Sequence, residues 1–163
     1  MAEPGEVLVL GIGNPDRGDD GVGRMAARLL AADAPAHVEV AESGGEATDI
    51  LEHLEDAASA ILIDACATGG AAGTVHRFDV SVEGLPSGVF GVSTHGFGLH
   101  EAIELGRALG CLPRRCVVYA IEGERFETGA PLSEAVAAAA EEVALRVRAE
   151  LAGGWSVREP GHA

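Results

Sequence analysis

Apolar runs alternate along the chain with segments in which apolar residues recur every three or four positions. Runs that are apolar on both faces are typical of buried parallel strands, whereas the three-to-four spacing is typical of amphipathic helices. We therefore expect five strands, at residues 6–13, 37–42, 59–66, about 75–80 and 116–122. We also expect four helices, one beginning near Asp19 or Asp20 and the others at residues 47–57, 99–110 and 131–153.

The connection before the fourth strand is short and rich in glycine, which sets this strand apart from the others. So short a link favours antiparallel pairing over the helical crossover that joins parallel strands. The order of elements predicts an α/β fold, a three-layer α/β/α sandwich around a five-stranded, mostly parallel sheet with one antiparallel strand. Right-handed crossovers place the second and third strands on opposite sides of the first. A crevice then opens between the first and third strands at their carboxyl ends.

Length and composition predict one cytoplasmic domain over residues 1–163, with a core at about 6–152 and a flexible C-terminal tail. No apolar run approaches the roughly 18 residues of a membrane span, and the N-terminus lacks a signal-peptide pattern. The net charge of −15 would repel nucleic acid. Three cysteines stand in no metal-ligand spacing and fit thiols in a reducing compartment. We expect a monomer with neither a membrane nor a nucleic-acid partner.

The first strand runs into a glycine-rich turn, "LGIGNPDRGDDGVG" at residues 10–23. A dinucleotide-binding turn would need glycine where the chain has Asp16, and a carboxylate there would face the pyrophosphate. The Lys-Ser/Thr pair of a phosphate-binding loop is missing as well. The turn instead presents Asp16, Asp19 and Asp20, and we expect Asp19 to cap the following helix.

Three residues are expected at the predicted crevice. Asp20 follows the first strand, Asp64 ends the apolar run of the third, and His95 lies in the loop before the third helix. Taken singly, Asp64 also fits a capping role, and His95 fits a loop histidine with ordinary hydrogen-bond partners. Together, two carboxylates and an imidazole are suitable ligands for a divalent transition metal with open coordination positions.

The same residues resemble a known family, the hydrogenase maturation endopeptidases. Its members carry Gly-x-Gly-Asn, an acidic pair and Gly-x-Gly after the first strand, as this chain does between Gly11 and Gly23. The family's strand ending in Asp-Ala corresponds to Asp64-Ala65, and its Ser/Thr-x-His loop to "STHGFGL" at residues 93–99. Order and spacing agree over residues 6 to about 150.

The resemblance implies an aspartic-type endopeptidase that removes a C-terminal peptide from a [NiFe] hydrogenase large-subunit precursor after nickel insertion. The family's metal-contacting and catalytic positions carry over to Asp20, Asp64 and His95. Nickel would be borne by the substrate, and other divalent metals can substitute for it. The departures are Pro15-Asp16-Arg17 after the asparagine, and Glu42-Ser43-Gly44-Gly45 where the family often has Asp-Gly-Gly. Both departures flank the predicted crevice, so we expect them to affect which substrate is bound.

Several assignments stay open from the sequence. Asp16, Asp20 or Asp64 could activate water. Glu122, at the end of the last strand, could line the cleft or cap a loop. Arg17 could meet a substrate carboxylate or be solvated. We expect surface roles for the four histidines that show no clustering, His37, His53, His76 and His162. Rival functions are a hydrolase with its own bound metal and a non-catalytic nickel-binding maturation factor.

Overall fold

The computed structural model describes residues 7–86 and 98–155, and within them one five-stranded mixed sheet. The strands are β1 (Val7–Ile12), β2 (Val38–Ser43), β3 (Ser59–Cys66), β4 (Val75–Asp79) and β5 (Arg115–Glu122). Their order in the sheet is β2-β1-β3-β5-β4, with β4 antiparallel to β5 and the other neighbours parallel. The predicted fold class is confirmed, including the antiparallel fourth strand and the placement of β2 and β3 on either side of β1.

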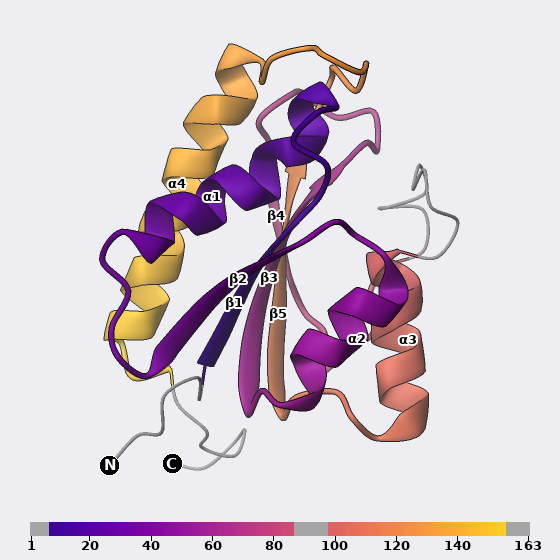
Figure 1. Ribbon diagram of the computed structural model, residues 1–163, viewed down its shortest axis with the longest axis vertical. Coiled ribbons are helices and arrows are strands. Elements are labelled where there is room, and N and C mark those ends of the chain that lie inside the picture. Colours follow the sequence, from indigo (N-terminus) through magenta and orange to yellow (C-terminus); the bar gives the residue numbers. More distant parts are fainter. Residues whose placement is uncertain (1–6, 87–97, 156–163) are drawn as a thin grey trace.

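Helices cover both faces of the sheet (Figure 1). They are α1 (Val22–Ala31), α2 (Ala47–Glu55), α3 (Leu99–Leu109) and α4 (Glu134–Ala152), and a short 3-10 helix, η1 (Gly18–Gly21), precedes α1. In Figure 1, α1 and α4 lie side by side on one face, and α2 and α3 lie on the other. Because helices cover both faces, the central strands are apolar on both sides, which is why they read as continuous apolar runs.

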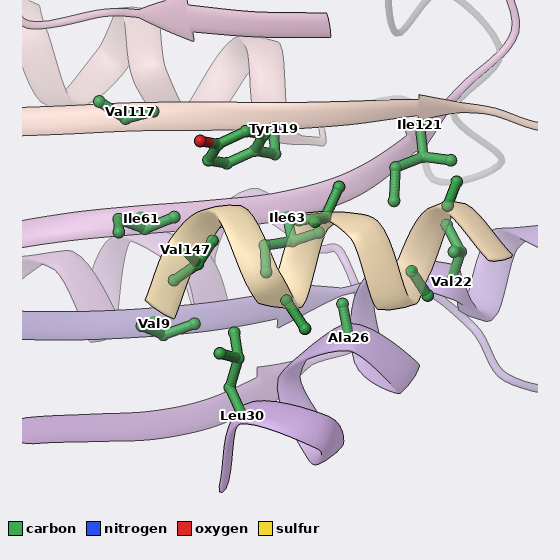
Figure 2. Close-up of a cluster of buried hydrophobic side chains, with 14 of the residues drawn as sticks. Val9, Val22, Ala26, Leu30, Ile61, Ile63, Val117, Tyr119, Ile121 and Val147 are labelled. Carbon is green, nitrogen blue, oxygen red and sulfur yellow. The ribbon is translucent and has the colours of Figure 1, made fainter. Parts of the chain in front are cut away.

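Side chains of β1, β3 and β5 alternate between two cores. Ile61, Ile63 and Tyr119 point toward α1 and α4, where they meet Ala26 and Val147 (Figure 2). Their neighbours along the same strands point toward α2 and α3. Complete burial of one such aliphatic side chain contributes about 1.5–3 kcal/mol to folding, so these two layers fix the register of the strands.

Helix α3 ends at a glycine. Gly110 caps the C-terminus of α3 with φ of 73°, a left-handed conformation that glycine adopts without strain. None of the helices in residues 7–86 and 98–155 is long and apolar enough to cross a membrane.

Candidate functional site

The turn after β1 fixes Asp20 at the carboxyl edge of the sheet. The backbone N–H of Asn14 donates to Asp20 Oδ2 at 2.9 Å. Gly13 has φ of 140°, and a Cβ there would lie 1.9 Å from the carbonyl oxygen of Asp20. Only glycine fits so close an approach, so the glycine turn positions this carboxylate.

The side chain of the adjacent Asp19 makes its hydrogen bonds elsewhere in the protein, and its predicted role as a helix cap is wrong. The side chain is completely buried and accepts hydrogen bonds from the backbone N–H groups of Glu124, Arg125 and Ser133, at 2.8–3.0 Å. The Ser133 hydroxyl also donates to it. Burial alone would raise the pKa of Asp19, but these hydrogen bonds outweigh it and leave the pKa below its ordinary value. Because η1 comes between the turn and α1, Gly21 occupies the cap position of α1.

Asp64 is brought into the same site as Asp20. It is the sixth residue of β3, is partly exposed, and has its Oδ1 within 2.8 Å of the backbone N–H of Ala65. Burial raises the pKa of Asp64 well above its ordinary value, and the negative charge of Asp20 raises it further. Two carboxylates that repel each other across a desolvated edge are suited to receive a cation.

The third predicted ligand, His95, lies outside the described residues, as does the rest of the loop at 87–97. The structure describes where this loop ends. Helix α3 begins at Leu99, and the backbone N–H of Gly98 donates to Glu101 Oε1 at 2.8 Å. Since α3 is followed by β5, which is parallel to β3, the helix runs back from the carboxyl edge that holds Asp64.

The residues that depart from the family pattern lie around this turn. Asp16 is exposed; its backbone N–H donates to Asn14 Oδ1 at 2.9 Å, and its carbonyl oxygen accepts from Gly129 at 2.7 Å. Glu42 forms ion pairs with Arg24 at 2.8 Å and Arg28 at 3.0 Å. These pairs tie β2 to α1 behind the turn. Glu42 is thus engaged with two arginines of its own chain.

A second group of chemically active side chains was missed from the sequence. Cys66, His76 and Glu122 each have a ligating atom within 4.8 Å of the others. The expected surface role of His76 is wrong, because its Nε2 lies 3.0 Å from Glu122 Oε2. Glu122 also accepts from the backbone N–H of Thr68 at 3.0 Å and from the Thr68 hydroxyl. It therefore performs the capping role that was one of its two expected alternatives.

The electrostatics of this second group follow from burial. Burial, with the negative charges of Glu122 and Asp64, raises the pKa of the Cys66 thiol to about 12. Burial also acts to raise the pKa of Glu122, but the hydrogen bonds from Thr68 and His76 outweigh it, and that pKa lies below its ordinary value. A buried thiol with so high a pKa is a poor nucleophile. The neighbouring imidazole therefore does not make Cys66 an activated catalytic cysteine.

Comparisons with known proteins agree with the motif pattern. The sequence model described as hydrogenase maturation protease matches residues 23–150. The hydrogenase expression/formation protein HupD of Rhodobacter capsulatus is 31% identical over 140 residues, which is 83% of this chain and 66% of HupD. The corresponding protein HoxM of Azotobacter vinelandii is 31% identical over 149 residues, 88% of this chain and 70% of HoxM. The chain thus spans about two thirds of the length of these relatives.

The fold is also found in solved structures. The hydrogenase maturating endopeptidase HybD from E. coli superposes with a TM-score of 0.75 over 91% of this chain and 93% of that one, at 24% sequence identity. At this identity the likeness concerns the fold, and the family assignment depends on the sequence matches. Taken with the glycine turn and the strand-end carboxylates, those matches confirm the resemblance: the chain belongs to the hydrogenase maturation protease family.

Proposed function

We propose that this protein is a cytoplasmic endopeptidase that removes the C-terminal propeptide of a [NiFe] hydrogenase large-subunit precursor after nickel insertion. The observation that carries the proposal is the pairing of Asp20 and Asp64 at the carboxyl edge of the sheet, where the negative charge of Asp20 adds to burial in raising the pKa of Asp64. The family assignment supplies the class of reaction. HupD and HoxM are named for hydrogenase expression and formation, which supports a hydrogenase precursor as the substrate.

Nickel enters this proposal as part of the substrate. Carboxylate and imidazole are suitable ligands for divalent nickel, so Asp20, Asp64 and His95 would recognise an ion that the precursor already holds. The raised pKa of Asp64 supports this role, because an approaching cation offsets both the burial of the carboxylate and the repulsion from Asp20. The contact would hold the scissile peptide bond and a water molecule in reacting geometry.

In the cleavage step, water attacks the carbonyl carbon of the scissile peptide bond while a carboxylate accepts a proton from the water. The carbon–nitrogen bond then breaks, and the proton is delivered to the leaving amine. Asp16, Asp20 and Asp64 are the carboxylates available at the turn and strand end. The reaction needs no protein nucleophile, in keeping with the buried, high-pKa thiol of Cys66. Processing should therefore survive Cys66→Ser.

The proposal is tested by incubating the purified protein with nickel-loaded and nickel-free precursor and measuring the mass of the large subunit over time. We expect the loaded precursor to be shortened and the nickel-free precursor to stay full length, because the second lacks the ion that anchors it. Equal cleavage of both forms would contradict recognition through nickel. A stable complex in which the loaded precursor remains full length would instead indicate a non-catalytic maturation factor.

A hydrolase with its own permanent metal is distinguished by a difference in metal content. Wild-type protein and the Asp64→Asn variant are exposed to nickel, dialysed and analysed for bound metal. Recognition of substrate-borne nickel predicts the same content in both, since the carboxylate site would not retain an ion without the precursor. A full equivalent that is lost with Asp64→Asn would favour the resident-metal enzyme.

A further inference from the structure

Three side chains of types that bind transition metals project from one face of the sheet near the ends of β3 and β5. Cys66 and Glu122 are direct partners in the parallel register of these strands. His76, on β4, is the partner of Ala120, which lies two residues before Glu122 on the same face. The three ligating atoms all lie within 4.8 Å of one another. The group forms only in the folded sheet, because its members are far apart in the sequence.

The chemistry of this group fits a borderline-soft divalent ion. Thiolate, imidazole and carboxylate are all ligands of Zn²⁺, and three protein ligands with one open position are typical of non-structural zinc sites. Two ligand atoms on one tetrahedral ion lie about 3.5 Å apart. His76 Nε2 and Glu122 Oε2 are already closer than this, at 3.0 Å, and all three ligand atoms lie within 4.8 Å of one another.

Burial and hydrogen bonds hold the group in place before any ion arrives. The side chain of Glu122 is 1% exposed and Cys66 is 3% exposed, whereas the His76 side chain is 35% exposed and leaves one side open. The loop after β3 fixes the carboxylate through the N–H and the hydroxyl of Thr68. The backbone on either side is also tied down, because the N–H of Gly123 donates to the carbonyl oxygen of Cys66 at 2.9 Å.

The charge distribution favours a cation at this position. Glu122 is buried with its carboxylate facing the His76 ring at 3.0 Å, so an ion between the two groups would offset the buried negative charge. Asp64 lies two residues before Cys66 on the same strand and the same face, and it adds a second negative charge nearby.

We propose that Cys66, His76 and Glu122 form a metal-binding position for a Zn²⁺-class divalent ion, separate from the site of Asp20, Asp64 and His95. The proposal does not depend on nickel recognition or on peptidase activity. A purely structural role for the group would require the hydrogen bonds of Glu122 but no thiolate, and this difference makes the proposal testable.

Cobalt(II) is the probe, because a cysteine thiolate bound to it gives a charge-transfer absorption band in the near ultraviolet. Full-length protein is stripped of metal, reduced and titrated with Co²⁺, and Zn²⁺ is then added. We expect the thiolate band to appear and to be removed by Zn²⁺. The band should be absent in Cys66→Ser. His76→Gln removes a ligand and should weaken binding at least about tenfold, since even the loss of a group that only supports a ligand costs that much.

Two variants serve as matched controls. Cys111→Ser removes a partly exposed thiol in the turn after α3 and should leave the band unchanged. Asp56→Asn removes an exposed carboxylate at the end of α2 and should also retain the band. No band in the wild-type protein, or a band that persists in Cys66→Ser, would overturn the proposal.

A further measurement keeps the test valid if Cys66→Ser fails to fold. In the wild-type protein, Zn²⁺ should slow modification of Cys66 by a thiol reagent, as read by peptide mass, and His76→Gln should abolish that protection. Equal modification rates with and without Zn²⁺ would contradict the site directly.

Discussion

Asp19 and Asp20 are neighbours in the sequence with opposite environments. Asp19 is completely buried and meets three backbone N–H groups and one hydroxyl, so its charge is compensated inside the protein. Asp20 is partly exposed and accepts a hydrogen bond from one backbone N–H, and its negative charge raises the pKa of Asp64. The first holds the acidic turn to the segment after β5 and to the start of α4, and the second faces Asp64, where we propose that it meets a substrate-borne cation.

Removing the charge of Asp19 should destabilise the fold. Asn would keep one oxygen but turn an N–H₂ group toward the backbone donors, so Asp19→Asn should lower the free energy of unfolding by about 2–3 kcal/mol at neutral pH. Because the pKa of Asp19 is lower in the folded than in the unfolded state, its contribution is fully present above the ordinary carboxyl pKa of about 3.9. It is lost as the pH falls through the lowered folded value, so the difference between wild type and variant should shrink in acid.

Urea unfolding of both proteins at neutral pH and below that ordinary pKa measures this effect. Asp56→Asn, an exposed position at the end of α2, is the control and should change stability by less than about 0.5 kcal/mol. A constant difference between wild type and Asp19→Asn at both pH values would show that the Asp19 charge is not what stabilises the turn.

At the scale of elements, the start of α1 packs directly on the backbone of the sheet. A Cβ at Gly23 would lie 2.2 Å from the carbonyl oxygen of Ile63 and 2.6 Å from that of Ile12. These are backbone atoms of β3 and β1, which cannot move aside easily. The glycine therefore sets how closely α1, and the turn with Asp20 before it, can approach the strand that carries Asp64.

Gly23→Ala should lower the free energy of unfolding by about 1–3 kcal/mol, the usual cost of overpacking. It should also slow precursor processing beyond what the loss of folded protein explains, because it displaces Asp20 relative to Asp64. Gly44→Ala is the matched control, since a Cβ there meets nothing within 4 Å. Both variants are compared by thermal unfolding and by processing assays. The same stability and the same processing rate for Gly23→Ala and Gly44→Ala would contradict this account.

The elements themselves could be predicted because their signals are local. The apolar run "AILIDA" and the spacing of Val22, Ala26 and Leu30 depend only on neighbouring residues, and both gave elements near their observed bounds. The hydrogen-bond partners of Asp19 could not be predicted in this way, because one of them, Ser133, lies 114 residues away along the chain. The choice between capping a helix and accepting from a distant loop is decided by tertiary packing.

At the scale of the whole molecule, the parallel sheet decides which residues meet. The carboxyl ends of β1 and β3 are neighbours, so the strand order alone brings Asp20 and Asp64 together, and this much of the site was predictable. The group of Cys66, His76 and Glu122 depends on which residues pair across β3, β4 and β5, and the pattern within one strand does not name its partners in the next strand. His95 lies outside the described residues and stays a prediction.

The central claim is that Asp20 and Asp64 act as a pair on the nickel of the precursor, and the most direct test is the processing rate of Asp64→Asn. The substitution is nearly isosteric and removes one negative charge from a desolvated edge, so the fold should keep its unfolding midpoint. We expect cleavage of nickel-loaded precursor to fall at least about 100-fold, the lower range for loss of a group that acts in the reaction. Processing at the wild-type rate by a folded Asp64→Asn variant would contradict the account.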